Sequence, residues 1–238
     1  LLLRDQDVDQ LVTMDLILPA IEEMQCQYGE GHAYNLPRRI IMTDNREMAS
    51  MGGGLFYQDV FGAKTYTVVQ GGYAFHVSLY NAHTGQLLAF LQANRLGQLR
   101  TGATTGLAVK YLARQNATSV GIIGSGAQAG TQLEAIWKVR GITQAKVYSP
   151  NPEHRYAFAM RMSSSLGITV TAVDANRDAV AGSDIVACIA NNTDPVVLGE
   201  WLSPGVTVVG AGPTAWRARE LDEAAVTKAD RIYVDSLA

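Results

Sequence analysis

The sequence predicts an α/β protein with a Rossmann-type parallel sheet domain in its second half and an α+β domain in its first half. Two observations support this prediction. From residue 119 onward, apolar strands alternate with amphipathic helices, which is typical of βαβ units around a parallel sheet. Before that point, short β patterns follow a helical stretch and indicate an antiparallel or mixed sheet with flanking helices. The 238 residues, 47% of them hydrophobic, can bury the core of one large or two modest domains.

The first half is expected to begin with helices and continue with strands. Residues 7–24 carry apolar side chains at helical spacing, with Asp15 and Pro19 near an expected helix–helix junction. Three β patterns follow, at 38–42, 62–69 and 75–91, and the last is a hairpin that turns at 81–85. Thr101 is then expected to N-cap a helix rich in Gly, Ala and Thr.

The second half repeats strand and helix. Helices are expected at about 127–139 and 152–165, with a short helix between the third and fourth strands. Strands are expected at VGIIG (120–124), AKVYS (145–149), ITVTAV (168–173), DIVACIA (184–190), GVTVVGAG (205–212) and RIYVDS (231–236).

The turn GSGAQA (124–129) has the form G-x-G-x-x-A. Gly124 permits a tight turn, Gly126 lets phosphate oxygens approach the backbone, and Ala129 keeps the helix close to its strand. The first N–H groups of the helix then hold a pyrophosphate, which adds Ala127 and Gln128 to the predicted site. The motif alone could be only a tight connection, but its place between a strand and an amphipathic helix indicates a dinucleotide turn.

The end of the second strand predicts which dinucleotide is preferred. An acid there would bind the adenine ribose of NAD, but no acid appears until Glu153. Ser149, Asn151 and Arg155 could instead accept a 2′-phosphate, so NADP is the preferred prediction and NAD the alternative. Arg155 could also be only a solvated helix residue. Val209, in the late strand, is also assigned to the cofactor site.

Composition argues against several other classes. Charged residues make up 17% of the chain and its net charge is -3, which gives no reason to expect nucleic acid or an anionic membrane as partner. Cys26 and Cys188 are expected to be buried, reduced thiols, and the isolated histidines predict no metal site. The start of the chain does not read as a signal peptide and the apolar runs are too short for a bilayer, so a cytoplasmic protein is expected.

Several long segments together resemble the ornithine cyclodeaminase/μ-crystallin family: HTGQLLAFLQANRLGQLRTGATTGLAVKYLA, VGIIGSGAQAGTQLEAI, and LSPGVTVVGAG followed by RELDEAAVTKADRIYVDS. LRTGATT and the paired REL…VDS are the most specific pieces. The resemblance implies a homodimer of two-domain subunits, with substrate binding and dimerisation in 1–117 and a Rossmann dinucleotide-binding domain in 118–238. Family chains continue for several dozen residues beyond VDS and return to the first domain, so that domain is expected to lack a return segment here.

The resemblance also implies a carboxylate-binding site made of basic residues. The family's first arginine matches Arg39 best, with Arg38 a close competitor, since alternation lets only one of them face the site. Lys64 and Arg100 match the other two basic positions, and Thr101 is placed against the cofactor, to which Arg100 is also assigned. Lys64 lies among apolar neighbours and needs an anionic partner, while an expected helix start after Arg100 favours an anion. Surface roles for the lysine and the arginine pair, and a phosphate-only role for Arg100, are the alternatives.

One departure from the family separates two reactions. Ornithine cyclodeaminases carry an aspartate in the interval that reads GAGPTAWRARE here (210–220), where no acid precedes Glu220. Thr214 is the nearest polar residue and is assigned to substrate binding, but a hydroxyl is no general base without help. The resemblance therefore implies an NAD(P)H-dependent reductase of an imine next to a carboxylate, with a small imino or amino acid as partner. Lys64 and Arg100 are the predicted catalytic residues, Lys64 as a proton relay.

Three other functions stay open. One is an ammonia lyase that uses catalytic NAD, and a second is an amino-acid dehydrogenase or opine-type siderophore-precursor enzyme. The third is a non-enzymatic, crystallin-like binder of small molecules, which the retained basic trio disfavours.

Overall fold

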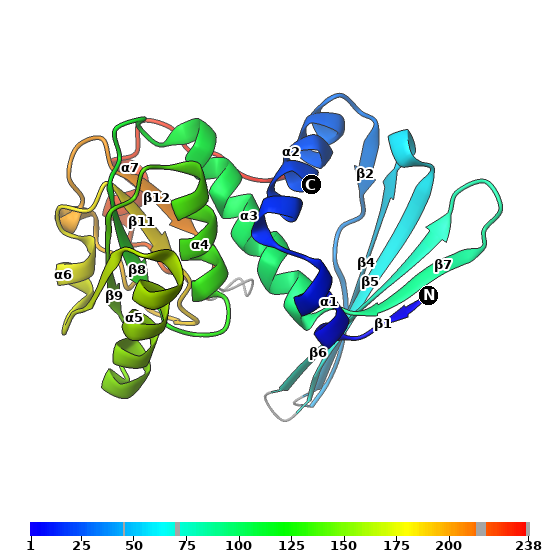
Figure 1. Cartoon of the computed structure of the whole chain (residues 1–238), viewed down its shortest axis with the longest axis horizontal. Coiled ribbons are helices and arrows are strands. Elements are labelled where there is room, and N and C mark those ends of the chain that lie inside the picture. Colours follow the sequence, from blue (N-terminus) through cyan, green and yellow to red (C-terminus); the bar gives the residue numbers. More distant parts are fainter. Residues whose placement is uncertain (45, 70–71, 213–217, 237–238) are drawn as a thin grey trace. The chain divides into compact units, whose positions relative to one another are not determined.

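The computed structural model describes residues 1–44, 46–69, 72–212 and 218–236. The chain forms two compact units, one of Leu1–Arg100 with Ser236 and the other of Thr101–Asp235, and each is described by itself (Figure 1). The division falls inside helix α3 (Asn94–Leu112). Within the described ranges, no helix combines the length and the apolar character needed to cross a membrane.

The first unit is built on a seven-stranded mixed sheet, as expected. Its strand order is β1-β7-β6-β5-β4-β2, with β3 also paired to β4, and β1–β7 is the parallel pair. The predicted hairpin is present, with the side chain of Asn81 accepting hydrogen bonds from the N–H groups of His83 and Thr84 in its turn. The elements are β1 (Leu2–Leu3), α1 (Asp5–Leu11), α2 (Met14–Gly29), β2 (Ala33–Asn35), β3 (Arg39–Thr43), β4 (Arg46–Leu55), η1 (Phe56–Gln58), β5 (Val60–Val69), β6 (Gly72–Asn81) and β7 (Leu87–Gln92).

Three details of the first unit differ from the sequence prediction. Cys26 was expected to be buried but is exposed on α2, whereas Cys188 in the second unit is buried as expected. The helix–helix junction lies at Thr13, whose side chain accepts from Leu16 N, and Pro19 lies inside α2 rather than at the junction. Strand β4 was not predicted, because its run of glycines hides the alternation that marks a strand. Pairing with β5 on one side and with β2 and β3 on the other forms it nevertheless.

Helix α3 begins at Asn94, eight residues earlier than an N-cap at Thr101 would place its start. The carboxylate of Asp5 accepts a hydrogen bond from Arg95 N at 2.9 Å and another from Asn94 Nδ2 at 2.7 Å. These bonds provide an acceptor for polar groups at the start of the helix, and the acceptor belongs to α1, about 90 residues earlier in the chain. Local sequence patterns cannot reveal such a distant partner. The prediction of Thr101 as an N-cap is therefore wrong, and Arg100 and Thr101 lie in the helix interior.

The second unit confirms the Rossmann-type prediction. Its five strands are all parallel in the order β10-β9-β8-β11-β12. The segment 231–236 was expected to be a further strand but forms no ladder, and Ile232, Tyr233 and Val234 are exposed. The elements are β8 (Ser119–Ile123), α4 (Ala129–Val139), β9 (Gln144–Tyr148), α5 (Pro152–Leu166), β10 (Thr169–Ala172), α6 (Asn176–Val180), β11 (Ile185–Cys188), η2 (Gly199–Trp201), β12 (Thr207–Gly210) and α7 (Glu223–Thr227).

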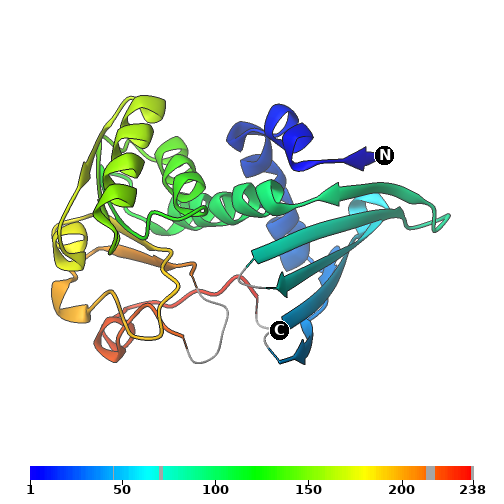
Figure 2. The same ribbon diagram turned by 90° about the horizontal axis from the view of Figure 1, so that it is seen from below.

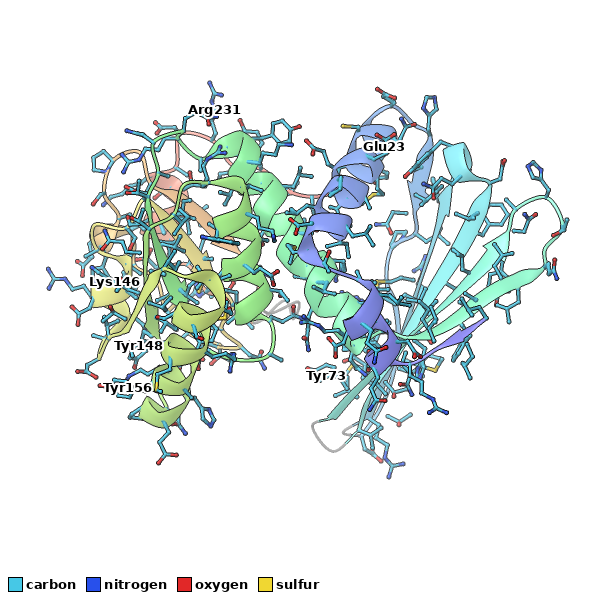
Figure 3. All side chains as sticks on the ribbon, viewed as in Figure 1. Glu23, Tyr73, Lys146, Tyr148, Tyr156 and Arg231 are labelled. Atoms are coloured by element: carbon cyan, nitrogen blue, oxygen red, sulfur yellow. The ribbon has the colours of Figure 1, made fainter. Side chains whose placement is uncertain are left out.

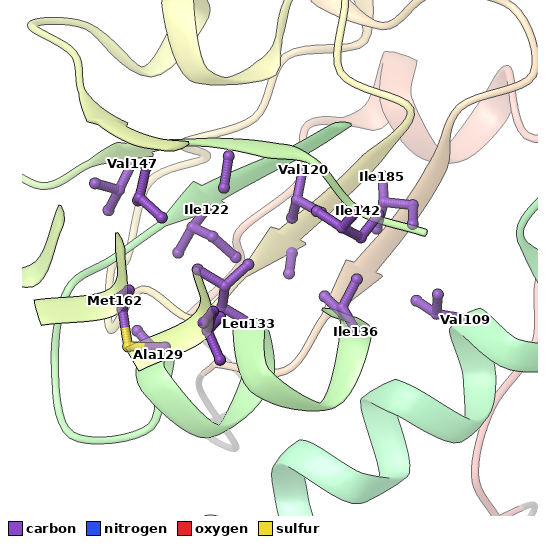
Figure 4. Close-up of a cluster of buried hydrophobic side chains, with 14 of the residues drawn as sticks. Val109, Val120, Ile122, Ala129, Leu133, Ile136, Ile142, Val147, Met162 and Ile185 are labelled. Atoms are coloured by element: carbon purple, nitrogen blue, oxygen red, sulfur yellow. The ribbon is translucent and has the colours of Figure 1, made fainter. Parts of the chain in front are cut away.

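Both faces of the parallel sheet are buried. Ile122 and Leu133 of α4 belong to one buried cluster (Figure 4), which also contains Phe158 of α5. Ile123 belongs to a second buried cluster, with Ala179 and Val180 of α6. Figure 2 shows the ribbon of this unit from a second side. This alternation explains why the strands are apolar throughout. Because all five strands are parallel, their carboxyl ends lie at one edge, where ligands bind in open α/β sheets.

Close packing explains the small residues of α3. A Cβ at Gly102 would lie 2.5 Å from the carbonyl oxygen of Thr131 in α4. A side chain at this position would therefore push the two helices apart. The Gly- and Ala-rich composition of the helix thus serves its contact with α4.

Candidate functional site

The two glycines of the turn after β8 have different roles. Gly124 has a φ of 109°, and a Cβ there would lie 2.8 Å from the carbonyl oxygen of Ile189. The fold itself therefore requires this glycine. Gly126 is exposed, and a Cβ on it would meet no atom within 4 Å. The protein leaves open space at Gly126, which is what a ligand phosphate needs to approach the backbone.

The start of helix α4 adds hydrogen-bond donors to this space. The helix begins at Ala129, whose N–H donates to the carbonyl oxygen of Gly126, and the side chain of the N-cap residue, Gln128, makes no capping hydrogen bond. Backbone N–H groups at a helix start are the donors that bind phosphate in known phosphate sites. Ala127 is exposed beside them. The turn and the helix start fit the pyrophosphate of a dinucleotide.

The three residues predicted to hold a 2′-phosphate lie together at the carboxyl end of β9. The Ser149 hydroxyl lies 2.7 Å from that of Ser125 in the glycine turn. The side chain of Asn151 caps α5 by accepting from His154 N at 3.1 Å. Arg155 is buried and its guanidinium pairs with Asp174, an acid that the sequence analysis did not single out. The position of Asp174 directly after the third strand was the available signal.

A buried carboxylate joins the carboxyl ends of β11 and β12. Glu220 accepts hydrogen bonds from Ala190 N at 2.6 Å and Gly212 N at 3.0 Å, and burial raises its pKa. A Cβ at Gly212 would lie 2.3 Å from a Glu220 oxygen, so this backbone must come close. Val209, in β12, packs half-buried against the core cluster. Thr214 lies outside the described residues.

In the first unit, the strand register places the two candidate arginines differently relative to Lys64. Lys64 on β5 lies opposite Met51 of β4, whereas Arg39 on β3 lies opposite Ser50. Because neighbouring residues of β4 point to opposite faces, Lys64 and Arg39 point to opposite faces of the sheet. Arg38 instead has its guanidinium 5.7 Å from the ring centre of Tyr66, which shares the Lys64 face. On this register the alternative, Arg38, lies nearer the Lys64 face than the preferred Arg39 does, and the choice between them stays a prediction.

The positive charges of two arginines act on the ammonium group of Lys64. Burial, and then the charges of Arg100 and Arg38, lower the pKa of Lys64 to about 8. Its Nζ lies 4.9 Å from the ring centre of Phe75 on β6. An ammonium group in these surroundings is stabilised by a nearby anion. With a pKa of about 8, Lys64 can also exchange a proton near neutral pH.

Three aromatic side chains and one acid lie beside this cationic cluster. Tyr66 donates a hydrogen bond of 2.8 Å to Glu47, and its ring lies 5.2 Å from that of Phe75. Tyr73, which is labelled in Figure 3, stacks on Phe75 with 5.7 Å between the ring centres. The sequence analysis did not assign Glu47, Tyr66 or Phe75 to the site, although the aromatic alternation of β5 and β6 was a signal. The arrangement suits a small anion with an apolar body.

The fold and the two groups of residues define a Rossmann-type α/β protein with a second, mixed-sheet unit that carries a cationic cluster. More particularly, the chain belongs to the ornithine cyclodeaminase/mu-crystallin family, whose sequence model matches residues 1–238. The family resemblance derived from the sequence is thereby confirmed.

Individual relatives are similar over different shares of their length. A Δ1-pyrroline-2-carboxylate reductase of Bacillus cereus is 38% identical over 160 residues, 67% of this chain and 49% of that protein. An alanine dehydrogenase of Archaeoglobus fulgidus is 30% identical over 247 residues, which span 100% of this chain and 74% of the relative. The structure of Thermococcus litoralis Δ1-pyrroline-2-carboxylate reductase in complex with NADH and L-proline matches with a TM-score of 0.92. It is 33% identical, over 96% of this chain and 73% of that one. The match to the Bacillus cereus relative thus spans about half of that protein.

Proposed function

We propose that this chain is an NAD(P)H-dependent reductase of an imine next to a carboxylate, such as a ketimine or the cyclic imine Δ1-pyrroline-2-carboxylate. The observation that carries the proposal is the cluster of Lys64, Arg100 and Arg38, whose mutual repulsion an anionic substrate would relieve. Relatives named for this reaction support it, and L-proline in the Thermococcus litoralis complex is the reduced form of the cyclic imine.

In this proposal the cationic cluster binds the substrate. The guanidinium groups of Arg38 and Arg100 hold the carboxylate by charge-assisted hydrogen bonds. The Lys64 ammonium contributes to the same site and donates a proton to the imine nitrogen, since its pKa of about 8 is close to neutral pH. Phe75 and Tyr66 offer apolar surface to the substrate body. Thr214 remains a sequence-based candidate for substrate contact.

The dinucleotide is proposed to bind in the second unit. Gly126, Ala127 and Gln128 hold its pyrophosphate, while Gly124 shapes the turn, and the reduced nicotinamide supplies the hydride when bound. Arg100, Thr101 and Val209 remain sequence-based candidates for cofactor contact.

NADP is proposed as the preferred dinucleotide and NAD as the alternative. The end of β9 carries Ser149 and Asn151 in place of the acid that would repel a 2′-phosphate. Arg155 lies beside them, but its guanidinium is paired with Asp174, so Ser149 and Asn151 carry the proposed preference. The Thermococcus litoralis relative binds NADH, which keeps NAD as the alternative.

We further propose that the domains are 1–117 and 118–238 and that the protein is a cytoplasmic homodimer. The sheet face opposite Lys64 supports a dimer, because it exposes apolar side chains that a second copy could cover. Ile41 lies opposite Met48 on this face, and Phe61 and Phe90 extend it. Sedimentation of the protein at micromolar concentration should give a dimer, and a monomer would contradict this part of the proposal.

The test of the reaction is a comparison of two substrates. The protein should oxidise NADPH in the presence of Δ1-pyrroline-2-carboxylate, which is followed as a loss of NADPH absorbance with time. Lys64→Met should strongly slow this oxidation, whereas the control Lys138→Met, in α4, should not. L-Ornithine with NAD should release no ammonia, because the interval 210–220 has no acid before Glu220. Rapid ammonia release would support a lyase instead, and oxidation of L-alanine by NAD a dehydrogenase. Ligand binding without any turnover would support the crystallin-like binder.

A further inference from the structure

An ion pair outside the glycine turn lies beside the proposed dinucleotide site. The guanidinium of Arg155 pairs with the carboxylate of Asp174. Arg155 is on α5, and Asp174 follows β10 by two residues. Asp174 is not a core residue, because its side chain is 80% exposed, whereas that of Arg155 is only 8% exposed. It also lies outside the glycine motif.

Strand register places this pair at the edge where the adenine ribose is expected. β10 is parallel to β9, with Ala172 opposite Val147, and Val173 N donates to the carbonyl of Val147 at 3.0 Å. Asp174 therefore leaves the sheet at the same edge as Ser149, the residue that replaces the ribose-binding acid. In Rossmann folds the end of the second strand is where the 2′-position of the ribose is read.

The arginine is fixed in place by neighbours other than the acid. Its Nη1 donates to the carbonyl oxygen of Ser149 at 3.0 Å. The guanidinium also lies 5.7 Å from the ring centres of both Tyr148 and Tyr156, which lie near each other in Figure 3. Removal of the Asp174 charge would therefore leave the Arg155 side chain in place. Its Nη2, which now donates to the carboxylate, could then donate to a bound ligand.

We propose that Asp174 is a specificity-determining residue that lowers the affinity of the protein for NADPH relative to NADH. Its carboxylate occupies the Arg155 guanidinium and adds a negative charge where a 2′-phosphate would arrive, and like charges repel. NADH carries a hydroxyl at this position, so its binding is nearly indifferent to the acid. The inference rests on the proposed function only in taking a dinucleotide as the ligand.

The experiment measures the dissociation constants of NADH and NADPH by nucleotide fluorescence, without turnover. Asp174→Asn removes the charge and keeps the size of the side chain. Asp178→Asn is the matched control, because this acid lies four residues further on, is exposed on α6 and has no ion pair with Arg155. Asp174→Asn combined with Arg155→Gln tests whether the arginine provides the gain. Thermal unfolding of each variant checks that it folds.

We expect Asp174→Asn to bind NADPH about ten-fold more tightly, the effect of roughly one charge-assisted contact, and NADH within about two-fold of the wild type. The double variant should lose the gain for NADPH, and Asp178→Asn should keep the wild-type ratio. An unchanged ratio in Asp174→Asn, or an equal change in Asp178→Asn, would overturn the inference, and these two single variants decide it even if the double variant does not fold. A wild type that binds neither dinucleotide would overturn the proposed function, and the inference with it.

Discussion

The lowered pKa of Lys64 makes the binding of a carboxylate depend on pH within an accessible range. The perturbation is a change from about pH 7 to about pH 9, which spans the Lys64 pKa of about 8. The ammonium is favoured below this pKa and the neutral amine above it. Only the ammonium attracts a carboxylate, so affinity should be full at the lower pH and fall as the pH rises through 8.

The magnitude follows from the fraction of Lys64 that is protonated. With a pKa of about 8 in the free protein, about nine-tenths of the lysine is charged at about pH 7 and about one-tenth at about pH 9. If only the charged form binds, the apparent affinity should fall by about ten-fold, or about 1.4 kcal/mol. A lysine with its ordinary pKa of 10.5 would give almost no change.

The assay is calorimetric titration with pyrrole-2-carboxylate, a planar carboxylate that has no titrating amine in this range. Lys64→Arg is the matched variant, because a guanidinium stays charged throughout and should give a flat profile. Arg100→Gln should move the decrease in affinity to higher pH, since the Arg100 charge is the largest electrostatic cause of the lowered pKa. A wild-type profile that is flat, or a decrease that persists unchanged in Lys64→Arg, would refute the assignment of this pKa to Lys64.

Three further predictions concern the second unit. Gly126→Asp should fold, because a Cβ there meets nothing within 4 Å, but should lose NADPH binding in a fluorescence titration, since its carboxylate repels the phosphates. Undiminished binding by the folded variant would remove the glycine turn from the site. Glu220→Gln should lower the free energy of unfolding in urea by about 1–3 kcal/mol, because an amide has one acceptor oxygen for the N–H groups of Ala190 and Gly212. Gly121→Ala should be destabilising by about 1–3 kcal/mol or more in the same assay, since its Cβ would lie 2.1 Å from a carbonyl oxygen of α6. Wild-type stability of either variant would contradict its prediction.

Much of the fold could be predicted because its signals are local. The alternation of apolar strands with amphipathic helices predicts the parallel sheet, and the hairpin at 81–85 follows from its turn residues. The errors arise where a distant residue decides. The start of α3 depends on Asp5, about 90 residues away in the chain, and β4 forms through strand pairing despite its glycines. The segment 231–236 has the alternation of a strand but forms no ladder in the structure.

The candidate site shows the same division between local and distant information. Motif matching proposed the glycine turn, Lys64 and Arg100 as site residues, since each is marked by its immediate neighbours. The placement of Arg38 and Arg39 relative to Lys64 needed the register of β3 on β4, which no local pattern specifies. Asp174 pairs with Arg155 across 19 residues. Its role therefore becomes visible only when β9 and β10 are laid side by side.

The bonds of Glu220 have a consequence for how the second unit opens. The side-chain carboxylate of Glu220 accepts hydrogen bonds from the backbone N–H groups of Ala190 and Gly212. The backbone carbonyl oxygen of the same residue accepts those of Val196 and Val197. These four amides belong to segments that are otherwise separate loops and strand ends. Because they share one partner residue, they should exchange with deuterium at similar rates through a single local unfolding event, while the neighbouring surface amides exchange earlier. The loops at this edge of the sheet would then open together as one cooperative unit.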